Sequence, residues 1–179
     1  MNIRLTILLV IILALVGGSA TYYWVNQPDD KKHVDRKWLY RVNDSDLIKI
    51  EVIHKTFDVT FSKAPGGNAW FIGGDPPVQV HGPKWSGTPF LLGGPAVERE
   101  LPKAKEPLSS YGLDPPESVV RVTERGGYTF EFSMGTTTPD GTFQYIKLVN
   151  EESIFTVAQE WAFVINKLAI EPPYPPTTP

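Results

Sequence analysis

Cysteine is absent from the 179-residue sequence. This absence excludes disulfides, thiolate metal sites, cysteine nucleophiles, covalently attached c-type haem and the lipidated cysteine of a bacterial lipoprotein. A basic excess is also absent, because 17 Lys and Arg residues stand against 20 Asp and Glu residues and give a formal charge of -3. A nucleic-acid-binding protein would carry a basic surface and a high isoelectric point. We therefore expect no nucleic-acid partner.

Recognisable catalytic and metal-binding motifs are missing as well. The three histidines, His33, His54 and His81, lie far apart along the chain, and no HExxH or comparable metal spacing occurs. The Gly-Gly pairs form neither a GxGxxG pattern nor a P-loop, and no Gly-x-Ser-x-Gly sequence is present. We therefore expect no catalytic residues, no metal site and no cofactor, and we do not expect an enzyme.

The first long apolar segment contains no charged residue from Leu5 to Val25. At about 1.5 Å per residue, a helix of this length spans about 30 Å, which is the thickness of a bilayer core. A single transmembrane anchor is therefore expected over residues 1–27. Its expected apolar and interfacial anchor residues are Leu5, Leu9, Ile12, Leu15, Tyr22, Tyr23 and Trp24. A cleavable signal peptide is the alternative, because Leu5 to Val16 has the length of an h-region and small residues follow it.

Two signals disagree about the side of the membrane on which the remaining chain lies. The cation count gives Arg4 on one side of the anchor against Lys31, Lys32, Arg36 and Lys37 on the other, which favours a cytoplasmic domain. The short tail before the apolar run instead resembles a secretory signal, and aspartates are interspersed among those four cations. We expect the domain on the periplasmic, extracytoplasmic side of a bacterial inner membrane, after a juxtamembrane linker over residues 28–46.

Alternation of apolar and polar residues after the linker indicates half-buried antiparallel strands. Three such strands are expected over residues 48–52, 57–61 and 70–72, and the same order recurs at 120–122, 128–132 and 143–146. We therefore predict an α+β domain over residues 47–170 that is mainly antiparallel β, with two three-stranded meanders in one or two sheets. The second strands of the two meanders match at an offset of 71 residues, which raises the hypothesis of a duplicated meander.

A C-terminal helix is expected over residues 158–169, after a short strand at residues 154–155. Thr156 and Gln159 have the spacing of a capping box, in which their side chains satisfy backbone groups of the first helical turn. Trp161, Ile165 and Leu168 recur at helical spacing and form an apolar stripe. Packing in the core explains this stripe fully, so no ligand is assigned to it.

Glycine and proline concentrate between the two meanders, where residues 64–116 contain 9 glycines and 10 prolines. This insert cannot form a long helix and should consist of turns and extended pieces. Its apolar residues either fold back over one end of the sheet or dock on a partner. A proline-rich tail over residues 171–179 should adopt polyproline II or remain disordered, or lie along a neighbouring subunit. The candidate partner contacts are Trp85, Phe90, Leu91, Leu92 and Tyr174.

A family resemblance begins at the sequence Tyr-Gly-Leu-Asp-Pro-Pro over residues 111–116. A strand at 119–122, a strand that ends in Gly135, a strand with Tyr145, a strand at 154–157 and the helix then follow. This order resembles the uncharacterised, membrane-anchored bacterial family called domain of unknown function 4340, and the resemblance covers about 120 residues when the first strands and Trp70 are included. It implies an extracytoplasmic domain that associates with other membrane proteins, sometimes transporters, and it supplies no catalytic residues. The chain departs from the family pattern over residues 76–100, where the family usually has a helix.

These observations together lead to one main functional expectation and two alternatives. We expect a non-catalytic, single-pass accessory subunit that contributes assembly and stabilising contacts to a larger membrane protein complex, with the lipid bilayer and other subunits as its partners. The expected host is a bacterial respiratory or photosynthetic electron-transfer assembly. The alternatives are an accessory protein of an ABC transporter and a free-standing envelope module that binds a ligand, for which Trp85 and Phe90 would form the platform.

Overall fold

The computed structural model describes residues 13–14, 16–19, 22 and 37–176 of the chain. The chain divides into two units, Met1–Asp35 and Arg36–Pro179. In the first unit, the described residues are helical and the side chain of Tyr22 is exposed. In the described part of the chain, no helix is both long and apolar enough to cross a membrane. Six of the expected anchor residues lie outside the described residues, namely Leu5, Leu9, Ile12, Leu15, Tyr23 and Trp24.

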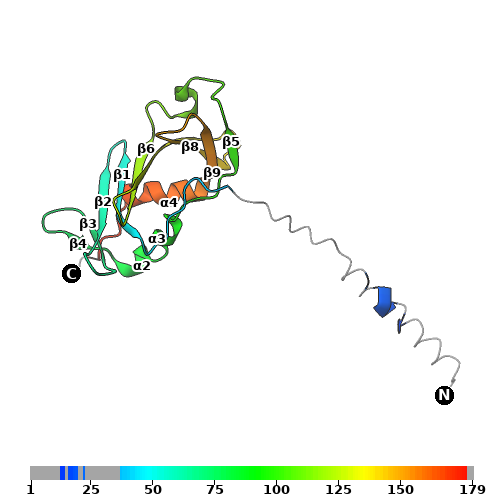
Figure 1. The fold of residues 1–179 in the computed structure, drawn as a ribbon, viewed down its shortest axis with the longest axis horizontal. Helices are drawn as coiled ribbons and strands as arrows, with labels where there is room; N and C mark the ends of the chain where they lie inside the picture. Colours follow the sequence, from blue (N-terminus) through cyan, green and yellow to red (C-terminus); the bar gives the residue numbers. More distant parts are fainter. Residues whose placement is uncertain (1–12, 15, 20–21, 23–36, 177–179) are drawn as a thin grey trace, which may run out of the picture. The chain divides into compact units, whose positions relative to one another are not determined.

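One antiparallel sheet organises the second unit, with nine strands among its described residues in the order β4-β3-β2-β1-β6-β7-β8-β9-β5 (Figure 1). The strands are β1 (Leu47–His54), β2 (Asp58–Lys63), β3 (Trp70–Ile72), β4 (Val78–Gln79), β5 (Arg99–Leu101), β6 (Ser118–Glu124), β7 (Thr129–Thr137), β8 (Phe143–Leu148) and β9 (Ile154–Ala158). The prediction of a mainly antiparallel sheet followed by a C-terminal helix is therefore confirmed.

Both predicted meanders are present, and they are fused edge to edge. The first runs through β1, β2 and β3, and the second through β6, β7 and β8. Antiparallel pairing of β1 with β6, for example Ile50 opposite Val122, joins them into one continuous sheet. Apolar residues on the same face of both first strands make this pairing favourable, because cross-strand neighbours on one face pack together.

The topology repeats around the junction of the two meanders. Four successive strands precede a helix in each half, which gives β1-β2-β3-β4-α2 and β6-β7-β8-β9-α4. Ile50 lies opposite Phe61 in the first half as Val120 lies opposite Phe132 in the second, so the two positions are equivalent. Because β1 and β6 also pair with each other, the two halves are related by a pseudo-two-fold axis at the pair Glu51 and Arg121.

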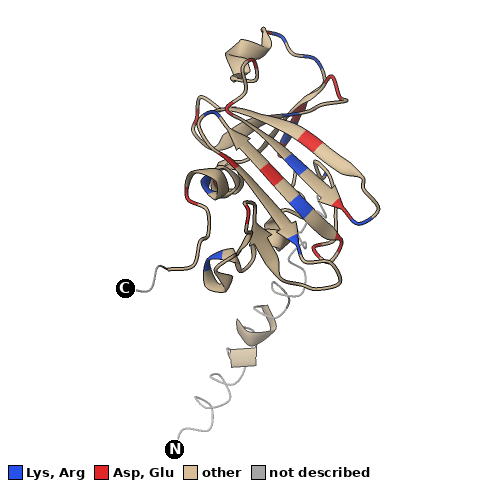
Figure 2. Ribbon diagram, turned by 90° about the vertical axis from the view of Figure 1, so that its left-hand side faces the viewer, with Lys and Arg blue, Asp and Glu red and all other residues tan. Residues whose placement is uncertain are grey.

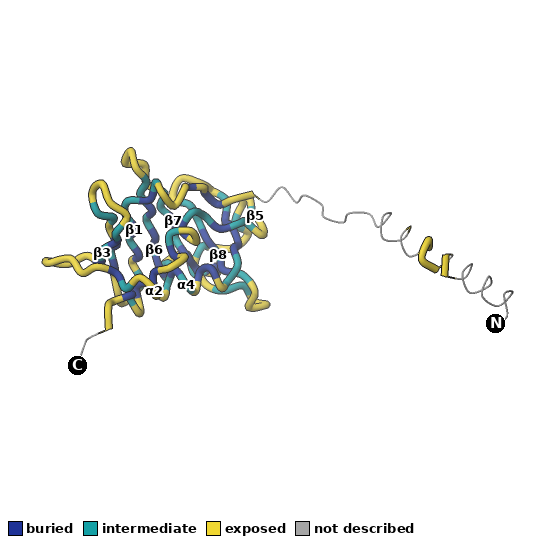
Figure 3. The backbone as a smooth tube through the Cα atoms, turned by 90° about the horizontal axis from the view of Figure 1, so that it is seen from below, coloured by how far each residue is buried: buried dark blue, intermediate teal, exposed yellow. Residues whose placement is uncertain are grey.

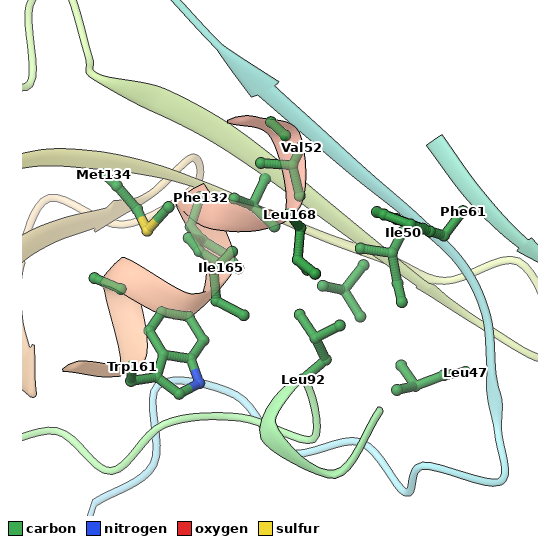
Figure 4. Close-up of a cluster of buried hydrophobic side chains, with 14 of the residues drawn as sticks. Leu47, Ile50, Val52, Phe61, Leu92, Phe132, Met134, Trp161, Ile165 and Leu168 are labelled. Carbon is green, nitrogen blue, oxygen red and sulfur yellow. The ribbon is translucent and has the colours of Figure 1, made fainter. Parts of the chain in front are cut away.

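Three helices of the described domain cover one face of the sheet (Figure 1). The main core lies between these helices and the sheet (Figure 4). The helices are α2 (Gly82–Trp85), α3 (Thr88–Leu91) and α4 (Gln159–Ile170). The predicted stripe of Trp161, Ile165 and Leu168 is buried on α4, where it faces the sheet. Buried residues follow the strands and the inner side of α4, whereas exposed residues concentrate in the loops (Figure 3).

The predicted capping box of α4 is wrong. Thr156 lies inside β9, is buried, and donates a hydrogen bond from Oγ1 to the carbonyl of Arg99 at 3.5 Å. The N-cap of α4 is Ala158, whose side chain makes no capping hydrogen bond. The reason is that β9 is held on both sides by β8 and β5, so the strand continues to the first residue before the helix.

Residues 37–46 belong to the folded domain, which corrects the expected linker over residues 28–46. Leu39, Tyr40 and Val42 are buried in the main core. The backbone N–H groups of Leu39 and Val42 donate to the carbonyls of Pro95 and Gly93 at 3.0 and 2.9 Å. Apolar side chains and paired backbone groups therefore hold this segment against the insert. Residues 28–36 lie outside the described residues.

Candidate functional site

Two of the five candidate partner contacts are part of the core. Trp85 is buried at the end of α2. The centroid of its ring lies 4.6 Å from that of Phe61 and 5.4 Å from that of Trp70. Leu92 follows α3 and has no exposed surface (Figure 4). Both side chains fold back over the sheet, as one of the two interpretations of this insert predicted. Neither side chain is therefore presented to a partner. A platform made of Trp85 and Phe90 for a ligand is likewise ruled out.

The other three candidates, Phe90, Leu91 and Tyr174, are exposed. The side chain of Phe90 is 79% exposed. Its backbone is nevertheless fixed, because the indole N–H of Trp161 donates to the carbonyl of the adjacent Leu91 at 2.9 Å. Tyr174 follows Pro173, whose carbonyl accepts a hydrogen bond from the backbone N–H of His81 at 2.8 Å. The start of the tail is therefore held on the domain, whereas residues 177–179 of the predicted 171–179 tail lie outside the described residues.

The exposed apolar residues on α3, α4 and the tail form what we call the helix-side surface. Its members are Phe90, Leu91, Phe163, Ile170 and Tyr174. The opposite face of the sheet has a different character. Acidic and basic residues lie on its central strands (Figure 2), where they alternate with the buried apolar residues. There Lys49 pairs with Glu51 at 3.0 Å and Arg121 pairs with Glu131 at 2.5 Å. A solvated, charged face thus lies opposite a face with exposed apolar residues.

A cavity of about 390 Å³, which we call the α4 pocket, opens between α4 and one end of the sheet. This end is where β1 stops at His54, where β6 begins after Glu117, and where Gln144 lies at the start of β8. From the helix side, Phe163 and Asn166 line the cavity. The α4 pocket combines two carboxylates, an ammonium group, an imidazole and three amides with an aromatic ring.

Hydrogen bonds fix the polar groups of the α4 pocket. Ser118, which is 2% exposed, donates from Oγ to Oδ1 of Asn166 at 2.6 Å. Gln144, which is 4% exposed, accepts from Thr137 at 3.1 Å and donates to the carboxylate of Glu117 at 3.3 Å. Its amide group also donates to the carbonyl of Gly135. The amide of Gln144 therefore has one orientation, set by a donor on one side and acceptors on the other.

The Tyr-Gly-Leu-Asp-Pro-Pro segment positions this end of the sheet. A Cβ on Gly135 would overlap the carbonyl oxygen of Tyr111, and Gly112 adopts a φ of +65° in close contact with Thr136. The rings of Tyr111 and Tyr145 meet edge to face, with their centroids 5.1 Å apart. The motif thus packs directly on β7 and β8, and the chain then runs straight into Glu117 at the α4 pocket. Its role in this structure is to position that end of the sheet.

The sequence contained signals for the α4 pocket that its analysis missed. Ser118 begins an apolar strand, Gln144 occupies a position with the alternation of a core residue, and Asn166 lies beside the apolar stripe of α4. A polar residue at a buried position needs partners. Ser118 and Gln144 are such residues and Asn166 is half-buried, so the three were a usable signal, but their proximity depends on the sheet order and on the packing of α4.

A second cavity of about 390 Å³ lies at the other side of β8 and is lined by residues including Arg99, Asp140 and Tyr145. Hydrogen bonds from the hydroxyl of Thr138 and the backbone N–H of Thr142 lower the pKa of the Asp140 carboxyl. These bonds close the turn between β7 and β8. The carboxylate of Asp140 therefore already accepts hydrogen bonds within its own loop.

Metal ligation has no geometric basis within the described ranges. No group of three or more His, Asp or Glu side chains there is placed to hold a metal ion. His54 lies at the α4 pocket and His81 precedes α2, whereas His33 is outside the described residues.

Comparisons with known proteins return one family. No curated protein and no solved structure matches the chain. The matched segment, residues 93–167, holds β5 to β9 and most of α4, and thus the second half of the repeat, but not the first. Over residues 93–167 the chain matches the family described as Domain of unknown function (DUF4340), which confirms the resemblance carried by the Tyr-Gly-Leu-Asp-Pro-Pro motif.

Proposed function

We propose that this protein is a non-catalytic accessory subunit of a larger membrane protein complex. In this proposal, residues 1–27 form one transmembrane anchor in a bacterial inner membrane, and the sheet domain lies on its periplasmic side. The single observation that carries the proposal is the apolar helix-side surface opposite a charged sheet face. Contiguous exposed apolar patches mark protein interaction sites, and in this proposal the exposed side chains of α3, α4 and the tail act as such a patch.

Phe90 is the proposed centre of the contact. Its neighbours Thr88 and Leu92 are buried, and the bond from Trp161 to the carbonyl of Leu91 fixes α3. The ring is therefore presented on a rigid element, so little conformational entropy is lost when a partner covers it. Aromatic side chains with this geometry are frequent anchors of interfaces. Leu91 and Tyr174 extend the contact.

The proposed host is a bacterial respiratory or photosynthetic electron-transfer assembly, to which this subunit supplies stabilising contacts. A chain without cysteine offers no thiolate ligands for iron-sulfur clusters, so its proposed role is support of redox partners. An ABC-type exporter is the alternative host. The identity of the chains that purify with this protein distinguishes the two.

Gentle detergent solubilisation followed by native gels and mass spectrometry tests the proposal. The wild-type protein should migrate with larger membrane proteins, and Phe90→Asp should release it. Tyr128→Asp is the matched control, because Tyr128 is also largely exposed but lies in the turn between β6 and β7, away from the helices. Migration of the wild type as a lone 20.0 kDa species would contradict the subunit proposal.

Protease accessibility tests the proposed topology. Protease added outside spheroplasts should digest the domain while a cytoplasmic marker stays intact. Digestion that requires access from the cytoplasmic face would place the domain on the other side of the membrane.

A further inference from the structure

The α4 pocket has the size and the composition of a small-molecule site. Its volume of about 390 Å³ lies within the range of about 300–1,000 Å³ that is usual for such sites. Strand ends form one wall and a helix forms the other, so the cavity is built from regular elements that hold their side chains in place. From the groups that line it, we propose that the α4 pocket binds a neutral saccharide ring.

Unused hydrogen-bonding groups at the α4 pocket call for a polar occupant. The Nδ1 atom of His54 is buried and has no partner among the described residues. Asn166 accepts from Ser118 through Oδ1, while its amide N–H groups donate to no described residue. Buried polar atoms are normally paired, because an unpaired one loses its interaction with water. The Nδ1 atom of His54 has almost no accessible surface, so a ligand in the cavity meets the half-buried amide of Asn166 instead, where an acceptor pairs with its N–H groups.

The charges at the α4 pocket favour a neutral occupant. Lys167 lies at the cavity, but its ammonium group pairs with Glu171 at 3.4 Å. Glu117 adds a second carboxylate. With two carboxylates against one ammonium group, the described cavity lining has no excess of positive charge to attract a phosphate or a carboxylate. Glu117 accepts hydrogen bonds, and Asn166 and Gln159 both donate and accept them, which matches the hydroxyl groups of a sugar.

An apolar rim completes the site. Phe163 is 60% exposed and Ile170 is exposed one helical turn beyond Asn166, and both line the cavity. Neither side chain belongs to the main core, so the packing of the domain does not explain why apolar residues occupy these two positions. A sugar ring presents C–H groups on its faces and hydroxyl groups around its edge. The ring can therefore lie on Phe163 while its hydroxyl groups reach Asn166, Glu117 and Gln159.

Amide signals in nuclear magnetic resonance spectra test this inference on the full chain. The protein is held in lauryldimethylamine oxide micelles, which contain no sugar, and is titrated separately with chitobiose and maltose. Chitobiose carries acetamido groups as well as hydroxyl groups, whereas maltose carries hydroxyl groups alone. Saturable shifts at the side-chain amides of Asn166 and Gln159 with either sugar would support the site. Shifts with chitobiose alone would assign it to amide-bearing glycans.

Two exposed phenylalanines give a matched pair of variants. Phe163→Ala should weaken binding about tenfold, whereas Phe90→Ala should leave the affinity unchanged. Glu117→Gln should also weaken binding, because it removes the charged acceptor. An absence of saturable shifts with both sugars, or equal binding by wild type and Phe163→Ala, would overturn the inference. Phe163 and Ile170 belong both to the helix-side surface and to the rim of the α4 pocket, whereas Phe90 does not line the pocket. Phe90→Asp therefore tests the subunit contact alone, and sugar binding by the purified protein in micelles tests the pocket alone.

Discussion

Among single residues, Gly135 has no space for a side chain beside its Cα atom. Replacement by alanine would drive a Cβ into the carbonyl of Tyr111, and neither backbone can move without disturbing β7 or the motif. We expect Gly135→Ala to lower the free energy of unfolding by about 1–3 kcal/mol, the usual cost of overpacking. Urea unfolding followed by circular dichroism measures this change.

A second glycine provides the control for Gly135. Gly82 begins α2 and has no atom within 4 Å of the position that a Cβ would occupy. Gly82→Ala should therefore leave the unfolding midpoint almost unchanged or raise it slightly, because alanine is the better helix former. Equal effects of the two substitutions would show that the contact between the motif and β7 does not matter for stability.

Tyr40 carries a hydroxyl group that the fold does not use. The oxygen is buried without a hydrogen-bond partner among the described residues, while the ring stacks on Phe130 and Phe132 at 5.1 and 5.6 Å. Tyr40→Phe keeps the ring and removes the unpaired hydroxyl. We expect it to raise the free energy of unfolding by about 1 kcal/mol.

The pH dependence of stability gives an independent check on Tyr40. Burial raises the pKa of its hydroxyl, so the folded protein holds this proton where the unfolded chain releases it. Stability from this group is therefore complete below about pH 10 and is lost as the pH rises further. In thermal melts above about pH 10, wild type should lose stability faster than Tyr40→Phe. Parallel loss in both proteins would contradict the burial of this hydroxyl.

At the scale of elements, α3 and the residue that follows it place the exposed side chain of Phe90 two residues before the buried side chain of Leu92. Leu92 is fully buried against the sheet and α4, so Leu92→Ala should cost about 2–5 kcal/mol of unfolding free energy. Phe90→Ala should change it by less than about 0.5 kcal/mol, because the ring is exposed. Chemical unfolding of both variants decides between the two placements. A large loss of stability from Phe90→Ala would mean that its ring packs inside the domain.

Local periodicity was sufficient to predict the elements that meet water on one side. The strands around residues 48–52 and 120–122 alternate because one face packs and the other is solvated, and α4 carries a buried stripe for the same reason. The capping box failed at Thr156 because pairing with β5 and β8 extends the preceding strand. Hydrogen bonds between distant strands therefore overrode a local signal.

Packing at the scale of the whole molecule explains why the burial of the insert and the assembly of the α4 pocket could not be predicted from the sequence. Trp85 has the composition signal of an interface anchor, and only the presence of Phe61 and Trp70 beneath it makes it a core residue. The polar groups at the α4 pocket come from His54, Glu117, Gln144 and α4, which are up to about a hundred residues apart. Their proximity follows from the pairing of β1 with β6, which no local pattern indicates.

The fused sheet makes a prediction about the cooperativity of the whole domain. Ile50 is fully buried and lies between Phe61 of β2 and Val122 of β6, at the centre of the nine strands. Ile50→Ala should lower the free energy of unfolding by about 2–5 kcal/mol. Because one core spans both halves, hydrogen exchange of slow amides in β2 and in β8 should lose protection by the same amount.

The neighbouring Ile53 supplies the control for this measurement. It lies on the same strand but is partly exposed on the opposite face, so Ile53→Ala should change protection in either half by less than about 0.5 kcal/mol. If Ile50→Ala weakens β2 while β8 keeps its wild-type protection, the two halves unfold separately. The repeated topology would then describe two adjacent folding units, and the pairing of β1 with β6 would be a docking contact rather than the centre of one core.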